Sequence, residues 1–290
     1  MSEILPHTAI SSAVEDVVGL ARCLAAAGLS TVPIPCNGTK VPCMKWKHLQ
    51  ERIPSADEIG QLYRGIVGLA VINGRVSGNK ETLDIDDPKL VEPFEAAVNA
   101  LLPGLLDRLT VVATPRENCE GRHYHYRVER PVPGSTKLAM SEPRPQFNRD
   151  GTPVIDPPTG QVRTCPDTLI ETRGEGAYSL IPGCPGACHE TGLKYERLSG
   201  PPLTELSTIS AAEHEALWTI ARSFNRYVGQ RDVRCGTTAR ARSRKAVDAA
   251  SMPALRALYP ASDSSVTANR SPRRAIRWRV AHGRSDSTAR

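Results

Sequence analysis

A chain of 290 residues with 40% hydrophobic residues can bury a sizeable core in one large domain or two smaller ones. Its net charge of +6 is uneven: residues 231–290 carry 14 Lys and Arg against 4 Asp and Glu, whereas residues 1–230 carry 23 against 27. No apolar run reaches the roughly 20 residues of a membrane helix and no signal-peptide pattern begins the chain, so we expect a soluble, cytoplasmic protein without a membrane partner and with free thiols.

Helical and strand patterns alternate in the first part of the chain. A capping box of Ser12 and Glu15 predicts a helix that ends near Gly28, and residues 29–35 then predict a strand. In the loop that follows, Lys40 is a candidate to neutralise a nucleotide phosphate, although a solvated loop lysine is the simpler interpretation of that residue alone.

A second capping box, of Ser55 and Glu58, predicts a short helix that ends near Arg64. Residues 68–74 predict a buried strand, and residues 81–86 predict its hairpin neighbour.

Two carboxylates lie close together in this second strand. Period-two alternation places Asp84 and Asp86 on the same face. Such a pair suits a divalent cation, which takes oxygen ligands from one or two carboxylates and completes its shell with phosphate oxygens. The alternative is an acidic turn at the end of a strand, and Asp87 is expected to cap the next helix.

A cationic strand face is predicted after the β-branched strand of residues 109–114. In residues 122–128, alternation places His123, His125 and Arg127 on one face and the two tyrosines on the other. A lone histidine is usually structural, but two histidines and an arginine on one face favour a functional role.

The next segments predict a long surface excursion and a returning strand. Residues 131–165 are rich in Pro, Gly, Arg and Asp, with a hairpin expected near Asp150. Residues 168–173 then predict a strand with Glu171 and Arg173 on one face. In a site that binds a metal and a nucleotide, Glu171 would be a third carboxylate for the cation and Arg173 would contact the phosphates. The alternative is that the two residues form a surface ion pair.

Metal-ligand residue types also occur in a Gly/Pro loop. Cys184, Cys188 and His189, with Cys165 upstream, have spacing compatible with Zn²⁺, but a second closely spaced cysteine pair is missing. Zinc is therefore a secondary hypothesis. A helix after Pro202 is expected to close the first domain, which we assign to residues 1–230.

Residues 231–290 have a different composition. They are rich in Arg and Ser with weak apolar periodicity, which is typical of a disordered basic tail able to bind a nucleic-acid backbone. The sequence contains no Gly-x-x-x-x-Gly-Lys-Ser/Thr phosphate loop. The abrupt change near Arg234 leads to the hypothesis that the tail is truncated or read out of the ancestral frame.

Taken together, these motifs resemble the N-terminal domain of bifunctional DNA primase/polymerases, the prim-pol domain of the archaeo-eukaryotic primase superfamily. The resemblance runs from about Ala13 to Leu198. It rests on five blocks in order: the loop with Lys40, Pro42 and Trp46; residues 74–78 (Gly-Arg-Val-Ser-Gly); residues 83–86 (Leu-Asp-Ile-Asp); residues 121–127 (Gly-Arg-His-Tyr-His-Tyr-Arg); and residues 170–178 (Ile-Glu-Thr-Arg-Gly-Glu-Gly-Ala-Tyr).

The resemblance implies an α+β fold in which an αβ unit packs with an RRM-like antiparallel sheet and the active site lies in the cleft. It implies that Asp84, Asp86 and Glu171 bind Mg²⁺ or Mn²⁺ and that His123 contacts the nucleotide phosphates. It also implies that Arg173 and Lys40 contact the nucleotide phosphates, and the cationic strand face adds His125 and Arg127 as candidate nucleotide-binding residues. The sequence departs from the family at Glu120, where a Gly-Gly pair usually precedes the histidine block, and in the longer loop of residues 117–120.

The function implied is DNA-dependent nucleotidyl transfer in the replication of a plasmid, phage or integrated element. Its partners would be a single-stranded DNA template, nucleoside triphosphates and a separate helicase or ATPase. One alternative is a rolling-circle endonuclease, since His123 and His125 resemble its His-hydrophobic-His motif, but this leaves the carboxylates without a role. Another is a catalytically inactive, truncated replication protein that binds DNA through its tail.

Overall fold

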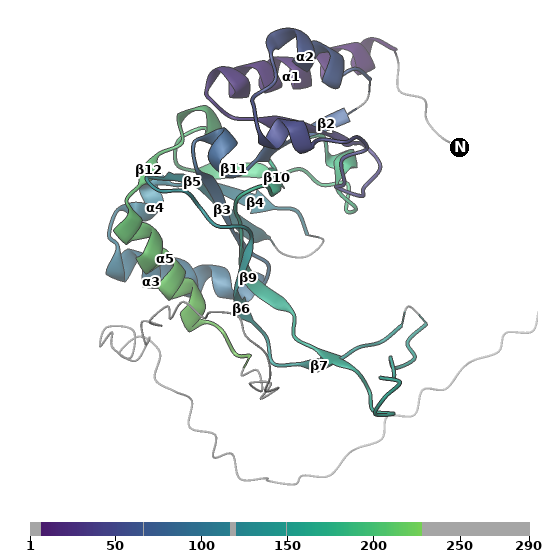
Figure 1. The fold of residues 1–290 in the computed structure, drawn as a ribbon, viewed down its shortest axis with the longest axis vertical. Helices are drawn as coiled ribbons and strands as arrows, with labels where there is room; N and C mark the ends of the chain where they lie inside the picture. Colours follow the sequence, from purple (N-terminus) through teal and green to yellow (C-terminus); the bar gives the residue numbers. More distant parts are fainter. Residues whose placement is uncertain (1–6, 66, 117–119, 149, 228–290) are drawn as a thin grey trace, which may run out of the picture.

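The computed structural model describes residues 7–65, 67–116, 120–148 and 150–227, which form a mixed α+β fold built on antiparallel sheets (Figure 1). The α+β prediction is thereby confirmed. The basic tail and the loop residues 117–119, both singled out in the sequence, lie outside the described residues. No helix within the described ranges is long and apolar enough to cross a membrane.

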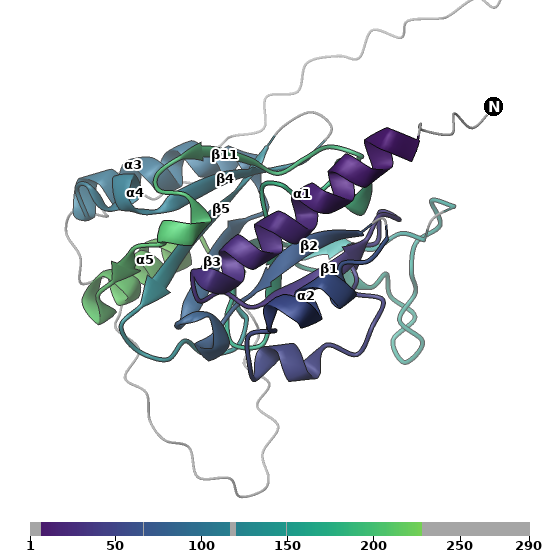
Figure 2. The ribbon, with the colours of Figure 1, turned by 90° about the horizontal axis from the view of Figure 1, so that it is seen from above.

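The smaller sheet has three antiparallel strands in the order β1–β2–β10. Their bounds are β1 (Thr31–Pro35), β2 (Val67–Ile72) and β10 (Tyr178–Leu180). Helices α1 (His7–Ala26) and α2 (Ala56–Leu62) lie along one side of this sheet (Figure 2). Leu24, Ile59 and Leu69 are buried between helices and sheet, so this packing fixes the smaller sheet to the two helices.

The two predicted capping boxes have different outcomes. The box at the start of α2 is confirmed, because Ser55 Oγ accepts a hydrogen bond from the Glu58 N–H (3.3 Å) and the Ser55 N–H donates to Glu58 Oε2 (2.8 Å). The box at Ser12 is wrong as a helix start, because α1 already begins at His7. No proline or glycine lies between His7 and Ser12 to prevent the earlier start.

The larger sheet has seven strands. Six of them follow the order β11–β4–β5–β3–β9–β6, and the seventh, β12, pairs in parallel with β5. The strands of this sheet are β3 (Lys80–Ile85), β4 (Thr110–Thr114), β5 (Gly121–Val128), β6 (Thr136–Met140), β9 (Thr168–Arg173), β11 (Glu196–Ser199) and β12 (Thr208–Ile209). Helices α3 (Val91–Leu101), α4 (Leu105–Arg108) and α5 (Ala211–Ser223) are on one side of this sheet (Figure 1).

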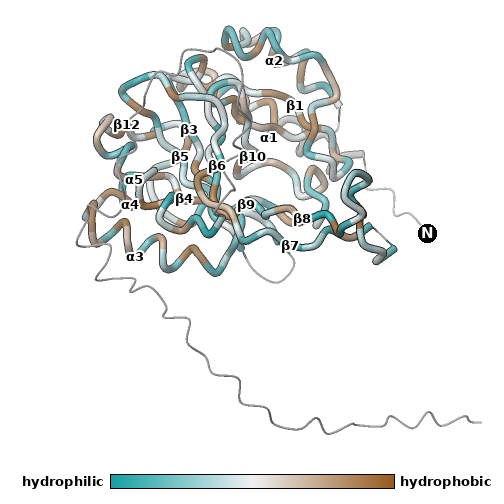
Figure 3. The backbone as a smooth tube through the Cα atoms, turned by 60° about the horizontal axis from the view of Figure 1, so that its bottom comes forward, coloured by the Kyte–Doolittle hydropathy of each residue, from teal (hydrophilic) through white to brown (hydrophobic). Residues whose placement is uncertain are grey.

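The two faces of the larger sheet have different chemistry. Leu83, Tyr124 and Tyr126 point into the core with Phe94 of α3, which confirms the alternation predicted for β3 and β5. The hydrophobic segments lie mainly within strands and helices, whereas the outer loops are mostly hydrophilic (Figure 3). The opposite face of β3 and β5 carries Asp84, His123 and His125, whereas the core face holds one buried acid, Glu81.

The predicted hairpin between β2 and β3 is wrong, although both strands exist. The two strands belong to different sheets, and their connection has only one bridge, in which the Gly74 N–H donates to the Lys80 carbonyl (2.8 Å). Strand β2 has β1 and β10 on its two edges, and β3 has β5 and β9. With both edges of each strand already paired, neither is left to pair with the other.

The predicted surface excursion is confirmed in part. Strand β6 lies within residues 131–165 but joins the larger sheet, so that part of the prediction is wrong. Strands β7 (Arg144–Pro145) and β8 (Thr164–Cys165) form a two-stranded arm that projects from the rest of the fold (Figure 1). The hairpin expected near Asp150 is present, with Phe147 bridged to Pro153.

Candidate active site

The register of three neighbouring strands brings the key polar side chains into one row. Asp84 of β3 pairs with His123 of β5 on one side and with Glu171 of β9 on the other. Directly paired residues of antiparallel strands project from the same face with their Cβ atoms close together. Three residues separated by up to 87 positions in the sequence thus become neighbours because of strand pairing.

The three predicted metal-binding acids converge. Asp84, Asp86 and Glu171 each offer a carboxylate oxygen, and these oxygens lie within 4.8 Å of one another, the only such set of three or more metal-ligand residues among the described ones. Asp86 follows the last residue of β3, so it continues the same side of the strand. Acidic oxygen ligands in this number are the donors that Mg²⁺ and Mn²⁺ prefer.

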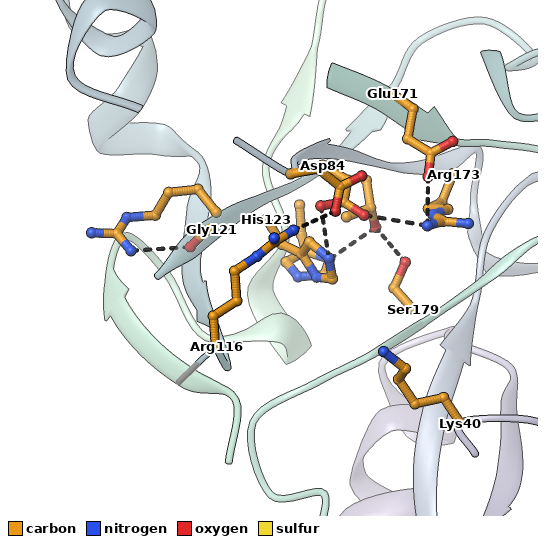
Figure 4. Close-up of polar contacts among 12 residues, drawn as sticks. Lys40, Asp84, Arg116, Gly121, His123, Glu171, Arg173 and Ser179 are labelled. Atoms are coloured by element: carbon orange, nitrogen blue, oxygen red, sulfur yellow. Dashed lines mark hydrogen bonds and ion pairs between the residues drawn. The ribbon is translucent and has the colours of Figure 1, made fainter. Parts of the chain in front are cut away.

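Two arginines neutralise these acids. Arg173 Nη2 lies 2.5 Å from Glu171 Oε1 and 3.4 Å from Asp84 Oδ2, and Arg116 Nη2 lies 2.8 Å from Asp86 Oδ1 (Figure 4). A guanidinium group therefore already stands as a cation between the carboxylates of neighbouring strands. The cluster is built to hold positive charge, which is the property that a divalent metal site requires.

The pKa values of the three acids shift in different directions, because burial and mutual repulsion raise them and neighbouring cations lower them. Burial, together with the charge of Asp84, raises the pKa of Asp86 to about 6. Burial also raises the pKa of Glu171. Burial by itself would raise the pKa of Asp84 as well, but His123 and Arg173 outweigh it and hold that pKa below its ordinary value. A cation near all three carboxylates would relieve their repulsion.

His123 lies at one end of the polar row, beside Asp84. Its Nε2 is 3.4 Å from Asp84 Oδ1, and its ring packs against that of Tyr195 with centroids 5.7 Å apart. The side chain is 8% exposed, and Nδ1 is buried without a hydrogen-bond partner. The imidazole is thus held by Asp84 and an aromatic ring, at the edge of the pocket described next.

A cavity of about 870 Å³ lies beside the polar row. It is lined by Asp84, Asp86 and His123 from the larger sheet and by Tyr178 from the smaller one. Glu171 does not line the cavity, but Arg173, its ion-pair partner, does. The cavity is large enough for a nucleotide, because ligand pockets commonly measure roughly 300–1,000 Å³.

Lys40 lies across this pocket from the acids (Figure 4). Its Nζ is 3.2 Å from both His189 Nε2 and Glu190 Oε1. Its backbone has a φ of 61°, which a side chain larger than glycine rarely adopts, and its carbonyl accepts a hydrogen bond from the Tyr178 hydroxyl (3.0 Å). The wall opposite the acids therefore carries one cation, Lys40, which is paired with the pocket residue Glu190.

His125 and Arg127, predicted to bind nucleotide, do not line the pocket. His125 is fully buried, and its Nδ1 lies 3.1 Å from Lys80 Nζ and 3.0 Å from Thr82 Oγ1. Arg127 instead donates to the carbonyl of Ala27 at the end of α1 (2.7 Å). The predicted alternation correctly put His125 and Arg127 on the same face of β5 as His123. From His125 to Arg127, however, the smaller sheet and α1 cover that face.

The same burial argues against the His-hydrophobic-His interpretation. His123 and His125 belong to no group of metal-ligating side chains within the described parts of the chain. Their rings lie edge to face, with centroids 5.5 Å apart, and the two imidazoles have separate surroundings. A site that needs both histidines on one metal is therefore not formed.

The predicted zinc set is not brought together. Cys165 is exposed in β8 on the projecting arm, whereas Cys184 and Cys188 are buried under the smaller sheet. His189 contacts Lys40 and Thr191 instead of a thiol. In place of the predicted set, Cys188 Sγ lies 3.5 Å from Cys36 Sγ, which makes these thiols part of the apolar core.

The pocket also contains three residues that were not among the predicted site residues. Arg116, Ser179 and Tyr195 all line the pocket. Ser179 alternates with Tyr178 in β10, and its hydroxyl donates to Thr82 across the two sheets (3.1 Å). The alternation of that strand could have indicated Ser179, but the loop positions of Arg116 and Tyr195 have no periodicity to reveal them.

Comparison with known families agrees with the motifs of the chain. Residues 21–212 match the family described as Bifunctional DNA primase/polymerase, N-terminal. The matched segment covers about two thirds of the 290 residues and includes the three acids, His123 and Arg173. No curated protein matches the chain.

Proposed function

Because this chain belongs to the bifunctional DNA primase/polymerase N-terminal family, whose members are nucleotidyltransferases, we propose that its pocket carries out template-directed nucleotidyl transfer. The observation that carries the proposal is the convergence of Asp84, Asp86 and Glu171 from two strands beside His123. The catalytic domain of the proposal comprises residues 1–230.

The three acids are proposed as the metal ligands. Their oxygens lie close enough to share cations, and the arginine between two of them supports a site that binds positive charge. Two divalent ions, Mg²⁺ or Mn²⁺, would activate a 3′-hydroxyl and stabilise the departing pyrophosphate. The role of the protein is to fix three carboxylates on paired strands, which are more rigid than loops.

The triphosphate is proposed to bind between the acids and Lys40 on the opposite wall. Arg173 offers a planar fork of donors next to the carboxylates, and Lys40 offers a point charge on the far side of the pocket. His123, anchored by Asp84, is proposed to contact a phosphate oxygen. His125 and Arg127 have no part in this proposal, because neither lines the pocket.

The finer family features are also part of the proposal. We assign the role of the RRM-like sheet to the larger sheet and the role of the family's αβ unit to the smaller sheet with α1 and α2, with the active-site cleft between the two. The template would be single-stranded DNA, and a separate helicase or ATPase would unwind it. The reaction would serve the replication of a plasmid, phage or integrated element.

The test is synthesis by the purified protein. Labelled nucleoside and deoxynucleoside triphosphates are supplied with single-stranded DNA, with and without a primer, and with Mg²⁺ or Mn²⁺. We expect products with the wild type and a loss of about 10³-fold or more for Asp84→Asn and Glu171→Gln. Asp87→Asn is the matched control, because Asp87 caps the turn after β3 (Oδ1 to the Lys89 N–H, 3.1 Å). Full activity in Asp84→Asn would rule out the assignment.

A further inference from the structure

Arg116 is a pocket residue to which neither the family motifs nor the sequence patterns give a role. It follows β4, its side chain is 40% exposed, and it reaches the acids from the side opposite Arg173 (Figure 4). Its Nη2 lies 2.8 Å from Asp86 Oδ1, which makes it the counter-ion of the carboxylate at the mouth of the metal site.

On the basis of the proposed function, we propose that Arg116 is displaced from Asp86 when the site takes up a divalent cation and then binds the triphosphate of the incoming nucleotide. In the structure, Arg116 contacts Oδ1 of Asp86, one of the three carboxylates that would hold such a cation. Its role would thus be to neutralise the site before loading and to hold the substrate afterwards.

The first step follows from charge and exposure. A divalent cation at the acids and the Arg116 guanidinium group would repel each other and compete for the Asp86 carboxylate, so uptake of the cation weakens the Arg116–Asp86 pair. The Arg116–Asp86 pair is partly exposed on both sides (40% and 35%), so the pair itself contributes little and water can solvate the released guanidinium. Arg173 is less easily displaced than Arg116, because it is shared between Asp84 and Glu171, whose side chains are only 8% and 14% exposed.

The second step follows from what surrounds Arg116. It lines the same pocket as Lys40 and His189 on the opposite wall. Burial and the charges of Lys40 and Arg116 lower the pKa of His189, so the two cations are near the same imidazole. A triphosphate in the pocket would be within reach of both cations, and the planar donor fork of arginine suits phosphate oxygens.

The experiment separates metal binding from nucleotide binding. Mn²⁺ affinity is measured by calorimetry on the full chain without nucleotide or DNA, for the wild type, Arg116→Gln, Arg116→Lys and Asp84→Asn. The affinity for a non-hydrolysable α,β-imido deoxynucleoside triphosphate is then measured at saturating Mn²⁺. Arg108→Gln is the matched control, because Arg108 forms a similarly exposed pair with Glu213 (2.6 Å) and does not line the pocket.

We expect Arg116→Gln to bind Mn²⁺ about three- to tenfold more tightly, because the competing cation is gone, and the triphosphate at least about fivefold more weakly. Arg116→Lys keeps the charge and should bind Mn²⁺ within about twofold of the wild type. Unchanged Mn²⁺ affinity or unchanged triphosphate affinity in Arg116→Gln overturns the proposal.

The controls keep the two proposals distinguishable. If Asp84→Asn loses Mn²⁺ binding while Arg116→Gln behaves as the wild type, only the role of Arg116 fails. If the wild type and Asp84→Asn bind Mn²⁺ equally, the metal assignment in the proposed function fails, and the role of Arg116 fails with it.

Discussion

Asp84 lies directly opposite Glu171 in the antiparallel pairing of β3 and β9, and the guanidinium of Arg173 contacts both carboxylates. The same Asp84 faces His123 across the other edge of β3. The site therefore depends on strand register. A slip of one residue in either pairing would turn these side chains to the helix-covered face of the sheet and destroy the arrangement.

Replacement of Arg173 by Gln should destabilise the metal-free protein. Asp84 and Glu171 would then be two mostly buried carboxylates without a shared cation. We expect the free energy of unfolding to fall by about 1–3 kcal/mol, less than for a fully buried pair because Arg173 is 40% exposed. The measurement is urea unfolding in the presence of a chelator.

Added Mn²⁺ should offset this loss. We expect a larger rise in the melting temperature for Arg173→Gln than for the wild type, because the metal replaces the missing charge. Arg144→Gln is the control, because it breaks an exposed pair with Asp167 (3.6 Å) and should change stability by less than about 0.5 kcal/mol. Equal metal-free stability of Arg173→Gln and wild type would contradict the counter-ion role.

Tyr126 and Tyr124 provide a matched pair on the core face of β5. The Tyr126 hydroxyl donates to Glu81 Oε2 (2.7 Å), and the Glu81 side chain is fully buried; the Tyr124 hydroxyl donates to the more accessible Glu95 (2.8 Å). We expect Tyr126→Phe to cost about 1–3 kcal/mol and Tyr124→Phe less than about 1 kcal/mol. Glu81 Oε2 would keep its contacts with His214 and Trp218 but lose a buried hydrogen bond that water cannot replace, whereas water can reach Glu95. Thermal unfolding of both variants provides the comparison, and equal losses would show that burial of the acceptor does not decide the cost.

Lys80 should make stability depend on pH. It is fully buried, and its Nζ contacts Asn73 Oδ1 (2.6 Å), Thr82 Oγ1 and His125 Nδ1. Burial lowers its pKa from 10.5 to about 7. Between these two values the unfolded chain holds a proton that the folded chain lacks, so stability rises as the pH increases through this range.

The pH effect is measured as a difference. The free energy of unfolding of the wild type minus that of Lys80→Met should increase between pH 7.5 and 9.5, by up to about 1.4 kcal/mol per pH unit. Lys89→Met, at an exposed lysine, controls for the loss of one surface charge. A difference that is flat or falls with pH for Lys80→Met would refute the prediction.

Gly121 should be required for the geometry of the site. A Cβ at this position would lie 2.6 Å from the carbonyl oxygen of Ile85 and 2.5 Å from Thr114 Oγ1, at the point where β5 runs between β3 and β4. We expect Gly121→Ala to lower stability by about 1–3 kcal/mol and to weaken Mn²⁺ binding, because β5 would be pushed away from Asp86. Gly134→Ala is the control, because no atom lies within 4 Å of its Cβ position. Wild-type Mn²⁺ affinity in Gly121→Ala would contradict the prediction.

The local patterns were sufficient for most of the elements. Alternation in residues 122–128 predicted which face of β5 is polar, and the capping box at Ser55 predicted where α2 begins. Both features depend on residues that lie within a few positions of each other in the sequence. The β2–β3 hairpin was wrong because strand partners are selected by long-range packing, to which two consecutive strands give no guide.

The acidic pair could be assigned from local sequence alone, because a strand's period of two fixes Asp84 and Asp86 to one side. The folded chain was needed to show that Glu171 and His123 flank Asp84, that Arg116 reaches Asp86 and that His125 is buried away from the pocket. Strand periodicity sets the direction of a side chain, whereas register and sheet packing set its neighbours and its access to solvent.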